Sequence, residues 1–175
     1  MIMENKPRLW VSTWGKYNDG SLDGDWFDLE DYADKEEFLE AARKRHKDDP
    51  DPEFLFNDFE GFPKAFYWES GVHDKLFEFI HLDTDDREVV EAYIDGVLGD
   101  VPDDFENARE KLMRVYDEHK TGADFAEEFA EEIGAIPEDM PTWISVDWEH
   151  TWKGNLRFDF DRVESEGKTY FFNSY

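Results

Sequence analysis

The feature that most constrains this chain is its excess of negative charge. Its 175 residues include 46 Asp and Glu against 19 Lys and Arg, which gives a formal net charge of −27 at pH 7. A chain this acidic could be disordered, because its charges repel one another and oppose compaction. However, 39% of the residues are hydrophobic, including 7 Trp, 7 Tyr and 16 Phe, and disordered acidic tails lack such side chains. We therefore expect a folded protein with an acidic surface.

The same charge limits the partners that the protein can bind. Nucleic acid is held by an excess of Lys and Arg, so direct nucleic-acid binding is not expected. An anionic membrane surface would repel the chain for the same reason. The sequence has no run of about 18 apolar residues, and its first residues, MIMENKPRLW, show no apolar signal segment. We expect a cytoplasmic protein that does not bind membranes.

Sequence patterns predict an α+β fold. Strands are predicted at 8–14, 26–29 and 54–59, with a helix at 34–47 between the last two. The segment 141–152 fits both helical spacing and strand alternation, and we favour a short helix there. Apolar periodicity predicts further helices at 87–99, at about 103–119 and from 124 onward. Gly99 is the expected end of the first of these, and Asp124 with Glu127 the expected capping box of the third. The segments 156–161 and 168–175 predict a β-hairpin with one solvent-exposed face.

The charge distribution divides the chain into three parts. Residues 1–47 have a net charge of −3, residues 48–110 of −16 and residues 111–175 of −8. Together with the predicted elements, this suggests three small domains. They are an N-terminal α+β domain at 1–62, an acidic helical domain at 63–110 and a C-terminal α+β domain at 111–175 with mixed helix and β-hairpin.

Familiar catalytic patterns do not occur in the sequence. There is no cysteine, the five histidines are scattered, and no GxSxG, P-loop or GxGxxG motif is present. Neighbouring carboxylates have little diagnostic value in a chain with 46 acids. We therefore predict no catalytic residues, no cofactor and no metal, and expect that the protein is not an enzyme.

One local pattern supports an alternative function. Asp19, Asp23 and Glu30 occupy positions 1, 5 and 12 of an EF-hand-like loop, with Ser21 at position 3 and Gly24 at position 6. An EF-hand needs a helix on each side, whereas the segment before this loop is predicted to be a strand. Calcium binding, or another carboxylate-based site in this loop, stays as the alternative to a function of the whole acidic surface.

The acidic surface itself suggests mimicry of DNA. Duplex DNA has one charge per roughly 1.7 Å of its axis, so a net charge of −27 corresponds to about 46 Å of duplex. A protein with carboxylates at such a density could occupy the basic DNA groove of another protein. Acidity that serves only solubility or growth at high salt is the other interpretation, but 11 Lys against 8 Arg and the many large aromatic residues argue against salt adaptation.

The candidate partner-binding carboxylates lie on two predicted acidic helical regions. Four alternate with the apolar stripe of the helix after Asp124, and the others occupy the strongly acidic middle of the chain. The full set is Asp83, Asp85, Asp86, Glu88, Glu91, Asp95, Asp103, Asp104, Glu127, Glu128, Glu131 and Glu132. We expect the binding energy to be shared among them.

Several segments resemble the ArdA antirestriction proteins. The opening segment LWVSTWGKYNDGSLDGDWFDL is similar to their N-terminal signature, in which a GKYN turn precedes an acidic glycine-containing loop and an aromatic pair. The similarity resumes at FNDFEGFP (Phe56 to Pro63), at FAEEFAEEIGAIPEDMP, and from the DWE segment to the end of the chain. The interior from about 72 to 120 matches only in being acidic and helical.

The resemblance implies a specific function. ArdA proteins are DNA mimics that occupy the DNA-binding groove of type I restriction-modification enzymes and inhibit restriction, often with modification. The family also implies an elongated molecule of three small domains, a homodimer, and carriage on mobile genetic elements. This chain departs from the acidic pattern at Arg43, Lys44, Arg45 and Lys47, so its N-terminal part is expected to bind less tightly than the middle.

Overall fold

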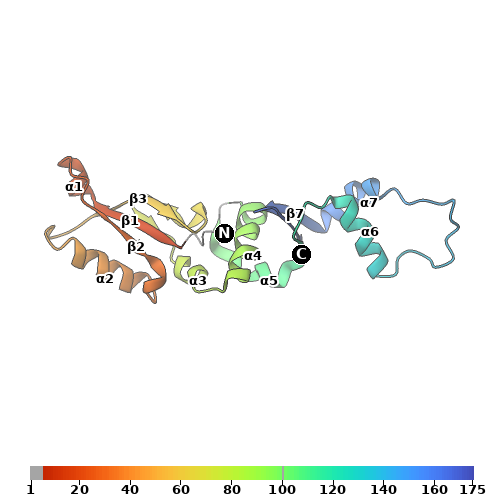
Figure 1. Cartoon of the computed structure of the whole chain (residues 1–175), viewed down its shortest axis with the longest axis horizontal. Helices are drawn as coiled ribbons and strands as arrows, with labels where there is room; N and C mark the ends of the chain where they lie inside the picture. Colours follow the sequence, from red (N-terminus) through yellow and green to blue (C-terminus); the bar gives the residue numbers. More distant parts are fainter. Residues whose placement is uncertain (1–5, 100) are drawn as a thin grey trace.

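The protein is elongated, and both ends of the described chain lie near the middle of its long axis (Figure 1). The computed structural model describes residues 6–99 and 101–175. A three-stranded sheet with its helices lies at one end, several short helices occupy the middle, and a second three-stranded sheet with two helices follows. The fold is α+β with antiparallel sheets, as the sequence predicts.

The N-terminal sheet has the strand order β2-β1-β3. Its strands are β1 (Arg8–Thr13), β2 (Asp25–Asp28) and β3 (Phe54–Glu60), and helices α1 (Trp14–Asn18), η1 (Leu29–Asp31) and α2 (Lys35–Arg45) connect them. Helix α2 begins at Asp34, whose carboxylate accepts a hydrogen bond from the Glu37 amide at 2.9 Å. Phe38 of α2 packs against Phe27 of β2 at a ring distance of 5.8 Å. The predicted strands and helix of this region are confirmed.

Short helices and a two-stranded ribbon form the middle of the molecule. The elements in order are η2 (Lys64–Phe66), β4 (Tyr67–Trp68), β5 (Gly71–Val72), α3 (Leu76–Ile80), α4 (Thr84–Tyr93), the π-helical η3 (Ile94–Leu98), η4 (Pro102–Asn107) and α5 (Ala108–Lys111). Gly99 ends η3 in the left-handed conformation, with φ of 61°, which glycine adopts without steric cost. Its predicted role as a helix terminator is therefore confirmed.

The C-terminal sheet has the order β6-β8-β7 and is covered on both faces. Its strands are β6 (Leu112–Tyr116), β7 (Phe160–Ser165) and β8 (Lys168–Asn173), and α6 (Gly122–Glu132), α7 (Trp148–Gly154) and η5 (Leu156–Phe158) lie between β6 and β7 in the chain. Phe172 of β8 packs on Tyr93 of α4 at 5.0 Å, whereas Phe171 stacks on Phe125 of α6 at 4.1 Å. Consecutive residues of β8 thus contribute to two different cores.

The larger core extends through most of the molecule. It joins the N-terminal sheet and α2 to α3, α4 and the face of the C-terminal sheet that bears Tyr170 and Phe172. The smaller core consists of Phe125, Phe160 and Phe171, with Trp152 and Phe129 packed against them. The apolar contact therefore continues across both boundaries of the three-part division, which stays a prediction.

The structure corrects three predictions in the second half of the chain. The helix expected at 103–119 is replaced by η4, α5 and strand β6, because Leu112, Val115 and Tyr116 pair with β8. The expected C-terminal hairpin is present, since β7 and β8 pair antiparallel, but its exposed face is wrong, because Thr169, Tyr170, Phe171 and Phe172 are all buried in the central strand. Residues 156–158 form the helical turn η5, and β7 begins only at Phe160.

Two helix starts also differ from the prediction. The capping box of α6 joins Thr121 to Asp124 and not Asp124 to Glu127, so α6 begins at Gly122. Of the ambiguous segment 141–152, only the part from Trp148 is helical, and it begins where the Asp147 carboxylate accepts a hydrogen bond from the His150 amide at 2.9 Å.

Replacing Gly122 by Ala should destabilise the smaller core. A Cβ at this position would lie 2.2 Å from the Trp152 ring, which packs against Phe125 and Phe171. We expect the variant to lose about 1–3 kcal/mol of unfolding free energy, as overpacked cores do. Thermal or urea unfolding measures this. Gly154→Ala is the control, because its Cβ would meet nothing closer than 3.5 Å. An equal loss of unfolding free energy in both variants would contradict a tight contact between Gly122 and Trp152.

Candidate partner-binding surface

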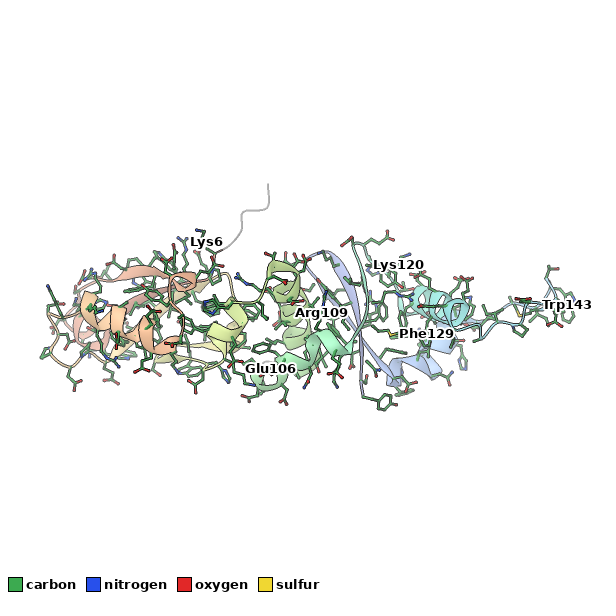
Figure 2. All side chains as sticks on the ribbon, turned by 90° about the horizontal axis from the view of Figure 1, so that it is seen from below. Lys6, Glu106, Arg109, Lys120, Phe129 and Trp143 are labelled. Atoms are coloured by element: carbon green, nitrogen blue, oxygen red, sulfur yellow. The ribbon has the colours of Figure 1, made fainter. Side chains whose placement is uncertain are left out.

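Carboxylates cover the molecule along its whole length (Figure 2). Most acids among the described residues take part in no ion pair, because the chain has too few cations to neutralise them. The question for each predicted site residue is therefore whether its charge faces solvent or is matched inside the protein.

The first turn of α4 concentrates three of the predicted carboxylates. Asp83 caps the helix by accepting a hydrogen bond from the Asp86 amide at 2.9 Å, and Asp85 and Asp86 follow in the first turn. Negative charge is favourable there, because the helix dipole places partial positive charge at the N-terminus. Asp85 is exposed and has no ion-pair partner in the described part of the chain, whereas Asp86 lies 3.3 Å from Arg109. The sequence thus folds locally in a way that holds an acidic cluster at the surface.

The later carboxylates of α4 and η3 lie against the C-terminal sheet. Glu88 pairs with Lys168 of β8 at 2.5 Å. Glu91 is only partly exposed, and loss of solvent, followed by the charge of Asp95, raises the pKa of its carboxyl group above the usual value. Asp95 of η3 is exposed. Glu91 is therefore the least suited of the set to present a full negative charge to a partner.

The two acids of η4 differ in their surroundings. Asp103 is 3.1 Å from the His73 ring, and its backbone carbonyl accepts a hydrogen bond from Lys75. Asp104 is exposed, and none of the described residues forms an ion pair with it. Both lie on the acidic middle of the molecule, near Glu106, which is labelled in Figure 2.

Helix α6 presents its four glutamates in two different ways. Phe125 and Phe129 pack in the smaller core, which turns Glu127 and Glu131 to solvent, and neither has an ion-pair partner among the described residues. Glu128 contacts Arg114 at 3.3 Å, Lys120 at 3.6 Å and the Tyr116 hydroxyl at 2.6 Å, and Glu132 pairs with the same arginine. The predicted acidic face thus has two parts. Glu127 and Glu131 form an open pair, whereas Glu128 and Glu132 are paired with Arg114 of β6.

Sequence reasoning missed the role of Arg114. The residue was assigned to a helix, and nothing in its sequence context indicates that β6 would place its guanidinium between two turns of α6. Over residues 6–99 and 101–175, the predicted residues for which no ion pair is found are Asp83, Asp85, Glu91, Asp104, Glu127 and Glu131. Loss of solvent and the neighbouring Glu128 carboxylate raise the pKa of the Tyr116 hydroxyl, so this group stays a hydrogen-bond donor.

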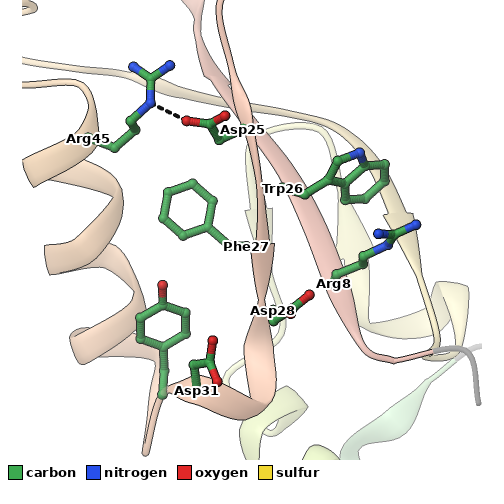
Figure 3. Close-up of a pocket in the computed structure, with 8 residues that line it drawn as sticks. Arg8, Asp25, Trp26, Phe27, Asp28, Asp31 and Arg45 are labelled. Carbon is green, nitrogen blue, oxygen red and sulfur yellow. Dashed lines mark hydrogen bonds and ion pairs between the residues drawn. The ribbon is translucent and has the colours of Figure 1, made fainter.

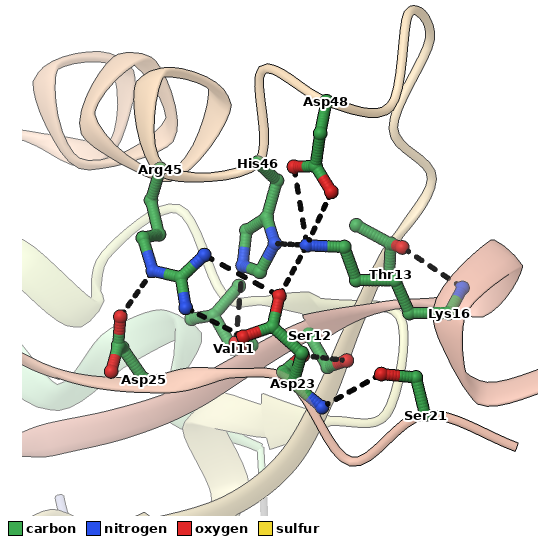
Figure 4. A network of polar contacts seen from close by, with 10 residues as sticks. All are labelled: Val11, Ser12, Thr13, Lys16, Ser21, Asp23, Asp25, Arg45, His46 and Asp48. Carbon is green, nitrogen blue, oxygen red and sulfur yellow. Dashed lines mark hydrogen bonds and ion pairs between the residues drawn. The ribbon is translucent and has the colours of Figure 1, made fainter.

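Lysine and arginine side chains of the protein pair with carboxylates of the EF-hand-like loop (Figure 4). Asp23 contacts Lys16 at 2.5 Å and Arg45 at 2.8 Å, and Asp25 also pairs with Arg45. Glu30 pairs with Arg87 at 2.8 Å, well outside this network. The Arg45 and Lys16 hydrogen bonds hold the pKa of the Asp23 carboxyl well below its usual range. The loop follows α1, contains strand β2 and ends in η1, and within the described residues its carboxylates form no group that could hold a metal ion, so the calcium alternative is not supported.

His46 anchors this network from inside the protein. Its side chain is fully buried, with Nε2 3.2 Å from the Val11 carbonyl and Nδ1 3.1 Å from the Lys16 ammonium group. Nδ1 must accept the lysine hydrogen bond, so Nε2 holds the ring proton and donates it to Val11. Burial, followed by the charge of Lys16, lowers the pKa of His46. A neutral His46 therefore joins β1 to α1 through its hydrogen bonds to Val11 and Lys16.

A shallow hollow of about 530 Å³ lies beside β2 (Figure 3). Its two arginines are already paired, Arg8 with Glu60 at 2.7 Å and Arg45 with Asp25. Arg8 also lies over the Trp26 ring, 4.7 Å from its centroid. Because both cations have carboxylate partners, the hollow offers no unmatched positive charge to a ligand.

Two further searches of the described residues give negative results. Over 6–99 and 101–175, no group of three His, Cys, Asp or Glu is arranged to hold a metal ion. Within the same residues, none of the helices combines the length and apolarity that crossing a membrane requires.

Acidification should weaken the fold partly through His46. An unfolded histidine takes up a proton near pH 6.5, whereas the lowered pKa keeps His46 neutral in the fold. The resulting stability is present above about pH 6.5 and is lost as pH falls through the folded pKa. Urea unfolding between pH 7.5 and 5 should show a steeper loss for the unchanged protein than for His46→Gln, which does not titrate. Parallel pH profiles would contradict this role.

Comparison with known proteins identifies the family. The family model described as antirestriction protein (ArdA) matches residues 9–164, which is most of the chain. A search among curated proteins finds no match. The matched range contains the Lys16–Asp23–Arg45 network, both acidic helices α4 and α6, and Arg114. On this evidence, the chain belongs to the ArdA family of antirestriction proteins.

Proposed function

We propose that the protein inhibits type I restriction-modification enzymes by occupying their DNA-binding groove as a DNA mimic. The observation that supports this most directly is the set of exposed carboxylates without an ion pair among the described residues, such as Asp85, Glu127 and Glu131, on an elongated body. A groove that binds duplex DNA is lined by Lys and Arg, and it gains affinity for any partner that replaces its counterions at similar spacing. The inhibitor acts in the cytoplasm, where these enzymes meet DNA, and performs no chemistry of its own.

The contacts of α4 and α6 support two different roles for the predicted carboxylates. Glu127, Glu131 and Asp85 can pair with a basic groove without breaking an existing ion pair. Glu88, Glu128 and Glu132 already have internal cation partners. In this proposal, the first three make direct contacts, and the paired glutamates add to the long-range field while holding the helices in place.

The three-part organisation and the two-copy assembly belong to the same proposal. The N-terminal part up to residue 62, the acidic middle at 63–110 and the C-terminal part from 111 form successive stretches of the mimic. Two copies would double the charged length to match a longer DNA site. The basic residues Arg43, Lys44 and Lys47 at the end of α2 make the N-terminal stretch the weakest.

Displacement of DNA should be stoichiometric. A labelled duplex bound to a purified type I restriction-modification enzyme is titrated with the protein, and fluorescence anisotropy reports the bound duplex. We expect complete release at a fixed ratio of inhibitor to enzyme binding sites, with the duplex left intact. Persistence of the enzyme–duplex complex at saturating protein, or release by cleavage of the duplex, would contradict the proposal.

Neutralising the open pair on α6 should weaken binding more than a matched change on α2. Glu127→Gln with Glu131→Gln removes two exposed, unpaired charges one helical turn apart. We expect a loss of up to about 2 kcal/mol, because each exposed charge pair contributes at most about 1 kcal/mol. Glu36→Gln with Glu40→Gln removes the same charge at the same spacing from α2, near the basic cluster, and should cost less. Equal losses in the competition titration would show that only total charge matters.

A further inference from the structure

Strand β2 forms an open edge of the N-terminal sheet. The strand order β2-β1-β3 gives β2 one neighbour, and among the described residues no strand pairs with its outer side. The opposite edge is partly covered, because Phe56 of β3 donates its backbone N–H to the Glu69 carbonyl at 2.8 Å and accepts a hydrogen bond from the Tyr67 hydroxyl. An open edge presents backbone donors and acceptors to which a further extended segment can bind.

The backbone groups of Trp26 and Asp28 point toward this open side. Leu29, directly after β2, donates its N–H to the Pro7 carbonyl at 2.8 Å, so these two residues form a hydrogen-bonded pair. Hydrogen-bonded and non-hydrogen-bonded pairs alternate along an antiparallel ladder. Phe27 therefore uses its backbone groups on β1, whereas Trp26 and Asp28 direct their N–H and C=O groups to whatever lies beside β2.

A row of charged side chains crosses the sheet and ends at Asp28. In the strand register, Arg8 of β1 lies opposite Glu60 of β3 on one side and Asp28 of β2 on the other. The Arg8 guanidinium binds Glu60 at 2.7 Å, and Figure 3 shows it turned away from Asp28. Asp28 is exposed and has no ion-pair partner in the described part of the chain. Because opposite charges on neighbouring strands attract, the next position in this row suits a cation.

The hollow of about 530 Å³ beside β2 gives room for an added segment (Figure 3). Trp26 and Asp28 lie on one face of the strand, and Phe27 lies on the other face with Tyr32 beside it, at a ring distance of 6.4 Å. Asp31 also lines the hollow, and no cation of the described residues pairs with it. Burial, followed by the charges of Asp31 and Asp28, raises the pKa of the Tyr32 hydroxyl. The unmatched charge in the hollow is therefore negative.

These charges decide which kind of segment fits the edge. A second copy of β2 would bring acidic side chains of both strands together, and like charges on neighbouring strands destabilise pairing. Charged edges also protect a sheet from uncontrolled strand addition. A segment with Lys or Arg at every second position avoids this repulsion, because it places a cation beside Asp28 and its alternate apolar side chains beside Phe27 and Tyr32. A basic extended segment is therefore the occupant that the edge favours.

We infer that an extended segment of a partner protein, with Lys or Arg at alternate positions, adds to the open edge of β2. It pairs with the backbone of Trp26 and Asp28 and places one cation beside the Asp28 carboxylate. This inference goes beyond the proposed function, because recognition here comes from the backbone of one strand and not from the charge of the whole surface. It depends neither on a restriction enzyme nor on the number of copies in the assembly.

Amide hydrogen exchange tests the contact residue by residue. The probe is a capped peptide of about eight residues in which Arg alternates with Val, added to the whole chain, and NMR follows individual amides. In the free protein we expect fast exchange at Trp26 and Asp28 and slow exchange at Phe27. Saturating peptide should slow exchange at Trp26 and Asp28 by about tenfold or more and change Phe27 little. Unchanged exchange at Trp26 and Asp28 overturns the inference.

A matched peptide separates strand addition from simple attraction to an acidic protein. It has the same sequence with an N-methyl group on every amide, so it keeps the arginines and their charge but has no backbone donor. Fluorescence anisotropy should show that it binds about tenfold more weakly or worse, because several hydrogen bonds are lost. Equal affinity of the two peptides would show that charge alone holds them, and the inference would be wrong.

Two variants locate the charge contact. Asp28→Asn removes the carboxylate at the open edge, and Asp58→Asn removes an exposed carboxylate from β3 of the same sheet. The first change should weaken binding of the unmethylated peptide by up to about fivefold, as an exposed ion pair does, and the second should weaken it less. Equal losses would contradict the placement of the cation beside Asp28. The DNA-displacement assay is unaffected by this outcome, so the proposed function is tested separately.

Discussion

The mutual repulsion of the carboxylates is the constraint to which the rest of the structure responds. Two charges 4 Å apart in water repel by about 1 kcal/mol, and salt screens the repulsion beyond about 8–10 Å. An elongated body keeps its acids farther apart than a sphere of equal volume would. The scarce cations lie where acids would otherwise crowd, with Arg114 between Glu128 and Glu132 and Arg45 beside Asp23 and Asp25.

Strand β8 lets so acidic a chain keep its helices in fixed positions. Tyr170 and Phe172 anchor α4 on one face, and Phe171 anchors α6 on the other by stacking on Phe125. The carboxylates of these two helices therefore project from opposite layers of one sheet. The mimicry that we propose benefits from this fixed spacing, because flexible acids would lose entropy on binding.

The sequence predicted the N-terminal half better than the C-terminal half, for physical reasons. Strands such as Arg8–Thr13 and the helix Lys35–Arg45 have clear alternation or clear capping and charge order, which are local signals. Strand β6 is specified by its pairing with β8, some 55 residues later, and its own residues fit a helix equally well. The same long-range pairing placed Arg114 against α6, so the division of the acidic face into open and neutralised glutamates could not be predicted. The acidic positions themselves were predictable, because Phe125 and Phe129 fix which side of the helix faces solvent.

The salt dependence of the complex tests the central claim most directly. If the protein binds as a substitute for DNA, it displaces the counterions of the basic groove, so its dissociation constant should rise steeply and linearly with salt on logarithmic axes. Titrating a purified type I restriction-modification enzyme with the protein at several salt concentrations measures that slope beside the slope for duplex DNA. We predict that the dissociation constant of the protein rises steeply with salt concentration, as that of the duplex does. An affinity that does not change with salt would contradict it.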